Sequence, residues 1–284
     1  ARGGMGSVAA ALSSSFLSFG GTIRKSSEVK KIIVSNQTAT GVELVSGEII
    51  NAKAIISNLD AKRTFLKIID ESDLPEDIVK RAKNFKIRGS SGKVNIALDG
   101  MPIFPALPEK SPLTLGHMHF SDTLERLERA YDDWKDDRWS SDPYVDMVIP
   151  TQYDPTMAPP GKHMMSVFVQ YCPVSPEGGW DDKKKKAFGD TVINQIGDYS
   201  PNFKDLILHA EIRTPHEIEK EVGLTEGNIF QGELTLDQLM FNRPFPGYAQ
   251  YRGPLKRMYM CSSSNHPGGG VMGAPGANAA REIL

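Results

Sequence analysis

The chain of 284 residues has little of what usually marks metal-binding, disulfide-linked or nucleic-acid-binding proteins. Its two cysteines, Cys172 and Cys261, match no metal or redox spacing, so we expect reduced thiols in the cytoplasm or, in a eukaryote, in an organelle such as the mitochondrial matrix. A net charge of -2 provides no basic field, and we predict no nucleic-acid partner. No apolar run is long enough to cross a bilayer, and the first residues lack the order of a secretory signal. The sequence therefore predicts a soluble protein.

Glycine, by contrast, is concentrated near the C-terminus, between an apolar strand predicted at residues 258–261 and a short predicted helix that closes the chain. Residues 268–276 contain five glycines, which permit positive φ angles and let a flat ring approach the main chain. The helix that follows would direct its free N–H groups at a phosphate or a developing anion. Because residues 277–284 are good helix formers, this pattern favours a cofactor site over a flexible tail.

The run Pro-Gly-Gly-Gly-Val-x-Gly-Ala-x-Gly-x-Asn-Ala-Ala at residues 267–280 resembles the C-terminal flavin-binding motif of the phytoene desaturase-like FAD-dependent oxidoreductases. One departure is Ser262, where the family pattern has glycine in a tight turn. Shorter motifs extend the resemblance over essentially the whole chain, in the family's order: residues 3–6, 28–29, 56–58, 64–66, 149–150, 154–156, 160–161 and 223–228.

The resemblance implies FAD as the cofactor, with its adenine end held at Glu28 and Val29. The cofactor-binding residues that it implies are Gly3, Gly4, Met5, Gly6, Glu28, Val29, Asn58, Pro267, Gly268, Gly269, Gly270, Val271, Gly273, Ala274 and Asn278. It names no metal ligand, and no side chain stands out as a general base. A second interpretation of Gly4-x-Gly6-x-x-Ala9 is a dinucleotide fingerprint, although a true fingerprint follows a strand.

The predicted fold is α/β, in the mixed α+β sense. The resemblance implies a partial FAD-binding (glutathione reductase-like) domain, residues 1–60 and 251–284, around a mixed-sheet substrate domain at residues 61–250. Short runs of β-branched residues joined by polar turns predict a three-strand meander over residues 31–50. The apolar run at residues 52–58 predicts a strand buried on both faces. The first four residues contain no initiator methionine and open on a motif, so we expect an N-terminal half to be missing.

Three further stretches leave alternatives open. His117 and His119 alternate along a predicted strand, but metal binding needs a third ligand that the spacing does not supply. The proline-rich segment at residues 101–108 is either a loop over the core, the lip of an apolar tunnel or a membrane contact. Arg243 is expected either to cap or to pair with a carboxylate, the commoner role of a lone arginine.

Together these features predict an FAD-dependent oxidoreductase that takes a hydride from an apolar small-molecule substrate. This chain would be a C-terminal portion of it, inactive by itself and completed by the missing N-terminal half. The alternative is a non-catalytic binding or interaction domain related to flavoproteins. A third possibility, an amine oxidase, would require an aromatic cage that is not visible near the C-terminal motif.

Overall fold

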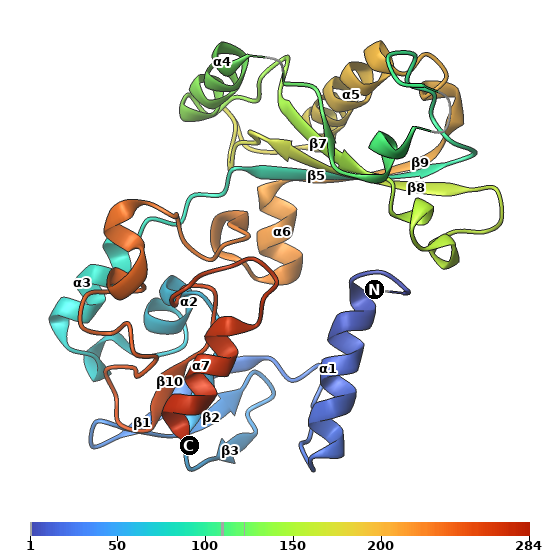
Figure 1. Cartoon of the computed structure of the whole chain (residues 1–284). Helices are drawn as coiled ribbons and strands as arrows, with labels where there is room; N and C mark the ends of the chain where they lie inside the picture. Colours follow the sequence, from blue (N-terminus) through green and yellow to red (C-terminus); the bar gives the residue numbers. More distant parts are fainter. Residues whose placement is uncertain (1, 109–110, 122) are drawn as a thin grey trace. The chain divides into compact units, whose positions relative to one another are not determined.

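The computed structural model describes residues 2–108, 111–121 and 123–284, and it divides the chain into two compact units. The first unit contains the residues up to Ile23 together with Ser90–Ile218, and the second contains Arg24–Gly89 together with Glu219–Leu284. Each unit combines helices with at least one sheet (Figure 1), which confirms the predicted α/β class.

An antiparallel sheet of five strands, in the order β6-β7-β8-β5-β9, organises the first unit. Apolar side chains alternate along these strands, and helix α5 covers the face where they gather (Figure 1). Val94, Ile96 and Val167 from the sheet are buried there with Phe188 and Ile196 from α5. The helices and strands of this unit are α1 (Gly6–Ser18), β5 (Ser91–Leu98), β6 (Met118–His119), α4 (Leu124–Lys135), β7 (Tyr144–Val148), β8 (His163–Gln170), α5 (Asp182–Tyr199) and β9 (Ile207–Arg213).

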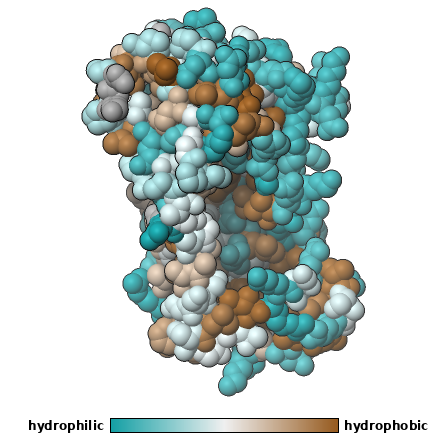
Figure 2. All heavy atoms as spheres, turned by 90° about the vertical axis from the view of Figure 1, so that its right-hand side faces the viewer, coloured by the Kyte–Doolittle hydropathy of each residue, from teal (hydrophilic) through white to brown (hydrophobic). Residues whose placement is uncertain are grey.

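Helix α1 has no buried residue. Its large apolar side chains lie in solvent; Leu12 is 69% exposed and Phe19, just beyond the helix, is 88% exposed. Apolar residues also reach the surface elsewhere on the face shown in Figure 2. Among the described residues, no helix is both long enough and apolar enough to span a membrane.

The second unit begins with the predicted meander, β1 (Val29–Ser35), β2 (Thr38–Leu44) and β3 (Ile49–Asn51), all antiparallel. Strand β4 (Ile55–Ser57) then pairs in parallel with β10 (Met258–Met260), which lies about 200 residues later. The core of this unit packs Phe65, Ile78 and Phe245 against Met258 and Met260. Its helices are α2 (Ala61–Leu66), α3 (Glu76–Asn84) and α7 (Ala274–Ile283), and α6 (Pro215–Val222) leads into it from the first unit.

Strand β4 is not buried on both faces, so that prediction was wrong. Ser57 is buried, but the Ile56 side chain is 50% exposed. The apolar run shows that the strand could be buried on both faces, but the residues that the structure describes pack against only one of them. As to domain bounds, residues 61–89 and 219–250, predicted to belong to the substrate domain, pack within the second unit.

Candidate flavin site

The glycine turn, residues 266–273, connects the end of β10 with the start of α7. Gly268, Gly270 and Gly273 have φ angles of 99°, 134° and 68°, which side-chain-bearing residues rarely adopt. Gly273 is the N-cap of α7, and no side chain caps this helix. The first N–H groups of α7 therefore keep their donor capacity, and the positive end of the helix dipole faces the turn.

The glycines of the turn serve two different purposes. A Cβ atom on Gly269 would lie 2.9 Å from Cδ1 of Phe230, so this glycine allows close packing against residues 223–232. A Cβ on Gly273 or on Gly276 would meet no atom within 4 Å. The turn is thus packed against protein at its base and open at the start of α7, where a ligand has room to approach the main chain.

Arg243 holds the base of the turn, and its side chain is fully buried. Its guanidinium donates six hydrogen bonds of 2.8–3.3 Å, all to main-chain carbonyls: those of Phe230, Gly232, Glu233, Gln238 and Ser263. Burial lowers the pKa of Arg243 to about 10, so the group remains charged at neutral pH. Among the described residues no carboxylate pairs with Arg243, so that expectation was wrong. The other alternative, capping, agrees with the bond to the Gln238 carbonyl, which ends the short 3-10 helix Leu236–Gln238.

Serine and glutamine side chains connect the start of the turn to neighbouring loops. The Ser263 N–H donates to Oε1 of Gln231 at 2.8 Å, and Oγ of Ser264 donates to the Gln231 carbonyl at 2.5 Å. Oγ of Ser264 also accepts from the Ala61 N–H at 3.0 Å, at the start of α2. Ser262, the departure from the family motif, accepts from the Ser264 N–H at 3.1 Å and so tightens the turn with its side chain.

Asn278 fixes α7 to the turn through Tyr251. Nδ2 of Asn278 donates to the Tyr251 hydroxyl at 2.8 Å, and this hydroxyl donates to the His266 carbonyl at 2.6 Å. Oδ1 of Asn278 accepts from Arg281 at 2.8 Å. In this structure the Asn278 amide therefore positions the helix.

Asn265 is a residue that the sequence reasoning missed. Its side chain is 1% exposed, yet neither Nδ2 nor Oδ1 has a hydrogen-bond partner among the described residues. A buried polar group without a partner costs about 1–3 kcal/mol, so it calls for an explanation. In the sequence, Asn265 stands between three serines and His266-Pro267, and this position by itself predicts no role.

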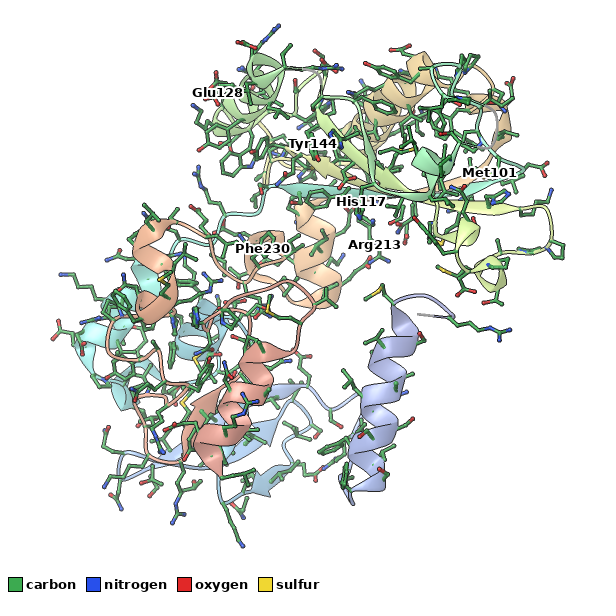
Figure 3. All side chains as sticks on the ribbon, viewed as in Figure 1. Met101, His117, Glu128, Tyr144, Arg213 and Phe230 are labelled. Atoms are coloured by element: carbon green, nitrogen blue, oxygen red, sulfur yellow. The ribbon has the colours of Figure 1, made fainter. Side chains whose placement is uncertain are left out.

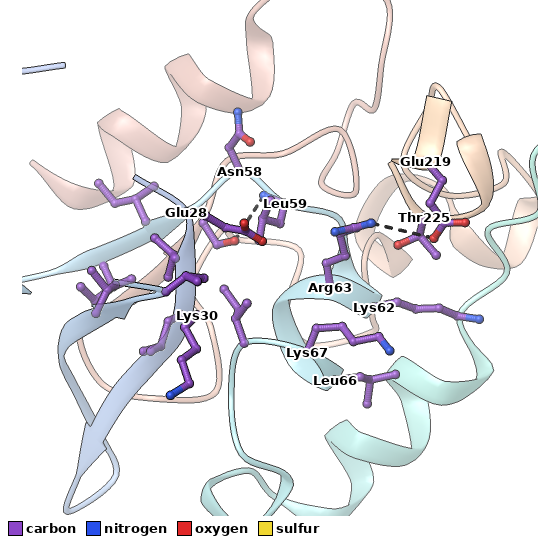
Figure 4. A pocket seen from close by; sticks show the side chains of 18 residues that line it. Glu28, Lys30, Asn58, Leu59, Lys62, Arg63, Leu66, Lys67, Glu219 and Thr225 are labelled. Carbon is purple, nitrogen blue, oxygen red and sulfur yellow. Dashed lines mark hydrogen bonds and ion pairs between the residues drawn. The ribbon is translucent and has the colours of Figure 1, made fainter. Parts of the chain in front are cut away.

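Glu28, Val29 and Asn58 lie together at a second feature, a cavity of about 890 Å³ that we name the β4 groove (Figure 4). Its wall is largely apolar, with Ile32, Ile55, Ile56 and Leu66 among its residues. Four cations reach it: Lys30, Lys62, Arg63 and Lys67. Lys30 is paired with Glu43 at 2.7 Å and Arg63 with Glu219 at 3.9 Å.

The predicted cofactor residues at positions 267–278 and the trio Glu28, Val29 and Asn58 all lie in the second unit. Residues 3–6, which the resemblance also implies, belong to the first unit. There the Gly3 N–H donates to the Asp154 carboxylate, and a Cβ on Gly4 would lie 3.0 Å from Cε of Met157. Hydrogen bonds from Thr156 and then from Gly3 lower the pKa of Asp154. Two motifs that lie about 150 residues apart in the sequence therefore meet.

The face of the five-stranded sheet away from α5 carries several polar side chains, among them Lys93, Asn95 and Ser166. His117 lies there with its Nδ1 3.0 Å from the Asp146 carboxylate (Figure 3), and Lys93 bonds Ser166. Burial lowers the pKa of Lys93, while Asp146 opposes this shift. In the described parts of the chain, no three His, Cys, Asp or Glu side chains are grouped so as to hold a metal ion.

The proline-rich segment at residues 101–108 forms one side of a separate cavity of about 470 Å³ within the first unit. Phe104 is buried in the core, whereas Ile103 is 62% exposed. Gln152 donates from Nε2 to the Thr114 carbonyl at 2.8 Å across this cavity. The segment is therefore a loop packed over the core that also leaves an apolar hollow.

Strand β10 lies parallel to the returning strand β4 and leads into a glycine turn and an uncapped helix. This is the arrangement that the resemblance to the phytoene desaturase-like FAD-dependent oxidoreductases implies. Comparison with known proteins confirms this predicted resemblance. The chain is 38% identical to Pyridine nucleotide-disulfide oxidoreductase domain-containing protein 2 of Rattus norvegicus, over 100% of this chain and 50% of that protein. It is 25% identical to Phytoene desaturase of Phycomyces blakesleeanus, over 82% of this chain and 38% of the relative.

A solved structure supports the same fold. An oxidoreductase from Methanosarcina mazei superposes with a TM-score of 0.60 and 18% identity, over 99% of this chain and 54% of that structure. No family model matches the chain. The chain spans about half the length of the curated relatives it matches first.

Proposed function

We propose that the protein containing this chain is an FAD-dependent oxidoreductase that takes a hydride from an apolar substrate. The observation that carries the proposal is the start of α7, where an uncapped helix meets glycines that face open space. Bound FAD would supply the two-electron acceptor. The portion of the protein described here is proposed to be inactive by itself, since it spans half of its relatives.

The residues at the turn fit a flavin in three respects. The N-terminus of α7 offers partial positive charge, worth about 0.3–2 kcal/mol toward an anion that develops beside it. Gly273 and Gly276 leave space for a planar ring. The unpartnered Asn265 amide supplies a donor and an acceptor, the complement of the imide edge of an isoalloxazine.

Each group would have a defined task in the reaction. Arg243 and the Tyr251–Asn278 pair would keep the turn and α7 in one geometry, so that no reorganisation accompanies electron transfer. The N–H groups of α7 would stabilise negative charge on the reduced ring. The main chain at Glu28 and Val29 would hold the adenine end; there the Glu28 carbonyl already accepts from the Val45 N–H at 2.9 Å.

An apolar substrate is proposed because one relative is named for the hydrocarbon phytoene. Hydride abstraction from such a molecule requires burial away from water, not a charged anchor. The check is anaerobic bleaching of the flavin absorption by isoprenoid hydrocarbons in detergent, with amines as the comparison. Bleaching by amines alone would contradict the proposal.

The cofactor is tested by the absorption spectrum of the purified full-length polypeptide. We expect an oxidised-flavin band, and we expect Gly276→Ala to weaken FAD binding at least about tenfold because its methyl group enters the open space. The matched control is Gly116→Ala, since a Cβ there also meets nothing within 4 Å. A colourless protein that FAD cannot reconstitute would favour the non-catalytic binding domain.

A further inference from the structure

Lys93 lies half-buried in the middle of β5, on the face of the five-stranded sheet away from α5. Its ammonium donates to Oγ of Ser166 in the neighbouring strand β8. Among the described residues, this hydroxyl is its only hydrogen-bond partner, and no carboxylate forms an ion pair with it. An ammonium has three N–H donors, so two of them find no acceptor in the described parts of the chain.

Two carboxylates on the same face, those of Asp146 and Glu211, bind other groups. Asp146 lies 3.0 Å from Nδ1 of His117 (Figure 3), and Glu211 accepts from Arg213 at 2.8 Å. Asp146 raises the pKa of Lys93, but burial is the larger effect and lowers it. The positive charge of Lys93 is therefore only partly compensated.

The register of the sheet places a second cation next to the first. Lys93 of β5 lies directly opposite Arg213 of β9, whose side chain is on the same side of the sheet (Figure 3). Like charges that face each other on adjacent strands destabilise a sheet. Glu211 reduces this repulsion from the side of Arg213. An anion bound at Lys93 would remove what remains of it.

The donors beside Lys93 define the kind of anion. Oγ of Ser166 accepts from Lys93, so its own O–H remains to donate, and no described residue accepts it. An ammonium N–H and a hydroxyl O–H that lie side by side match the two oxygens of a carboxylate. Because both side chains belong to paired strands in the middle of a sheet, their positions are fixed before a ligand arrives.

Apolar side chains continue the same face beyond Ser166. Val148 lies opposite Ser166, and the pair Ala97 and Met164 follows along the strands. Ala97 is exposed, and Val148 and Met164 are partly exposed. We propose that Lys93 and Ser166 bind the carboxylate of an apolar small-molecule acid, whose apolar part lies over these three side chains.

The inference goes beyond the proposed function, because hydride transfer to a flavin requires no charged anchor. The acid binds at this face whether or not it is itself oxidised. Its binding is measured without reduction of flavin, so a colourless protein would leave the carboxylate site testable. Failure of the carboxylate site would in turn leave the flavin proposal standing.

Isothermal titration calorimetry of the full-length polypeptide tests the site with octanoate and octan-1-ol, which have chains of equal length. We expect octanoate to bind at least about tenfold more tightly, since hydrogen bonds to a charged group account for a difference of that size. Equal affinities for the two molecules would overturn the proposal. Inorganic phosphate that displaces octanoate at equal concentration would overturn the assignment of a carboxylate.

Substitutions locate the binding. Lys93→Met keeps the length of the side chain and removes a desolvated charge, so we expect a folded protein that has lost the preference for octanoate. Lys93→Arg keeps the charge and should retain the preference, and Ser166→Ala should weaken octanoate binding about threefold or more. The matched control is Lys204→Met, at an exposed lysine of the same unit, which should leave the preference unchanged. A preference that persists in Lys93→Met would show that the acid binds elsewhere and would overturn the proposal.

Discussion

Replacing Arg243 with methionine provides a direct test of how the glycine turn is held. The guanidinium is fully buried, and its six hydrogen bonds end on five carbonyl oxygens. Methionine fills much of the same volume but donates nothing. The Glu233 carbonyl keeps a hydrogen bond from Nε2 of Gln238 at 3.1 Å, whereas the other four oxygens lose their partner at once.

The magnitude follows from two opposing contributions. Removing the buried charge relieves a cost of about 3 kcal/mol, because burial lowers the pKa from 12.5 to about 10 and each pKa unit corresponds to about 1.4 kcal/mol. Each unpaired carbonyl costs about 1–3 kcal/mol, less where water enters. At about 1.5–2 kcal/mol for each of the four carbonyls that lose their partner, the gross loss is about 6–8 kcal/mol. After the relieved burial cost is subtracted, we expect Arg243→Met to lower the free energy of unfolding by about 3–5 kcal/mol.

Urea unfolding of the wild type and the variant measures this difference. Arg243→Lys should fall in between, since an ammonium has three donors where the guanidinium has five. Arg138→Met, at an exposed ion pair, should change stability by less than about 1 kcal/mol. Because the pKa of Arg243 stays near 10, the difference should be the same at pH 6 and pH 8. A loss below about 1 kcal/mol for Arg243→Met would refute the assigned role.

Two further substitutions test contacts that position the site. Asp60→Ala should lower the free energy of unfolding in urea by about 2–4 kcal/mol. The reason is that the buried Asp60 carboxylate accepts from the Arg63 N–H at the start of α2 and from the Thr225 hydroxyl at 2.7 Å. An unchanged free energy of unfolding would exclude this role. Glu217→Gln tests a pH dependence: burial opposes ionisation, but Lys185 and Thr214 outweigh it and lower the Glu217 pKa. The wild-type advantage in melting temperature should therefore be full above pH 4.5 and vanish as the pH falls through the lowered pKa of Glu217. An advantage that does not decline at all as the pH falls below 4.5 would contradict this assignment.

Local patterns predicted much of the fold. Short runs of β-branched residues located the meander, and helix formers after the last glycine located α7, because both signals depend on neighbours in the sequence. Local patterns do not determine burial, however: Leu124 lies on the same apolar stripe of α4 as the buried Trp134, yet it is 80% exposed. A stripe shows which face can be buried, whereas the neighbouring elements decide whether it is.

The site was less accessible to sequence reasoning. Composition marked the glycines, but it could not separate Gly269, packed on Phe230, from Gly276, which faces open space. Arg243 and Asn265 lie where loops meet only in the folded chain. Local sequence therefore shows neither that main-chain carbonyls bind Arg243 nor that the Asn265 amide has no partner among the described residues. The exposure of Ile56 could not be predicted either, because the apolar run at residues 52–58 does not show which of its side chains other elements will cover.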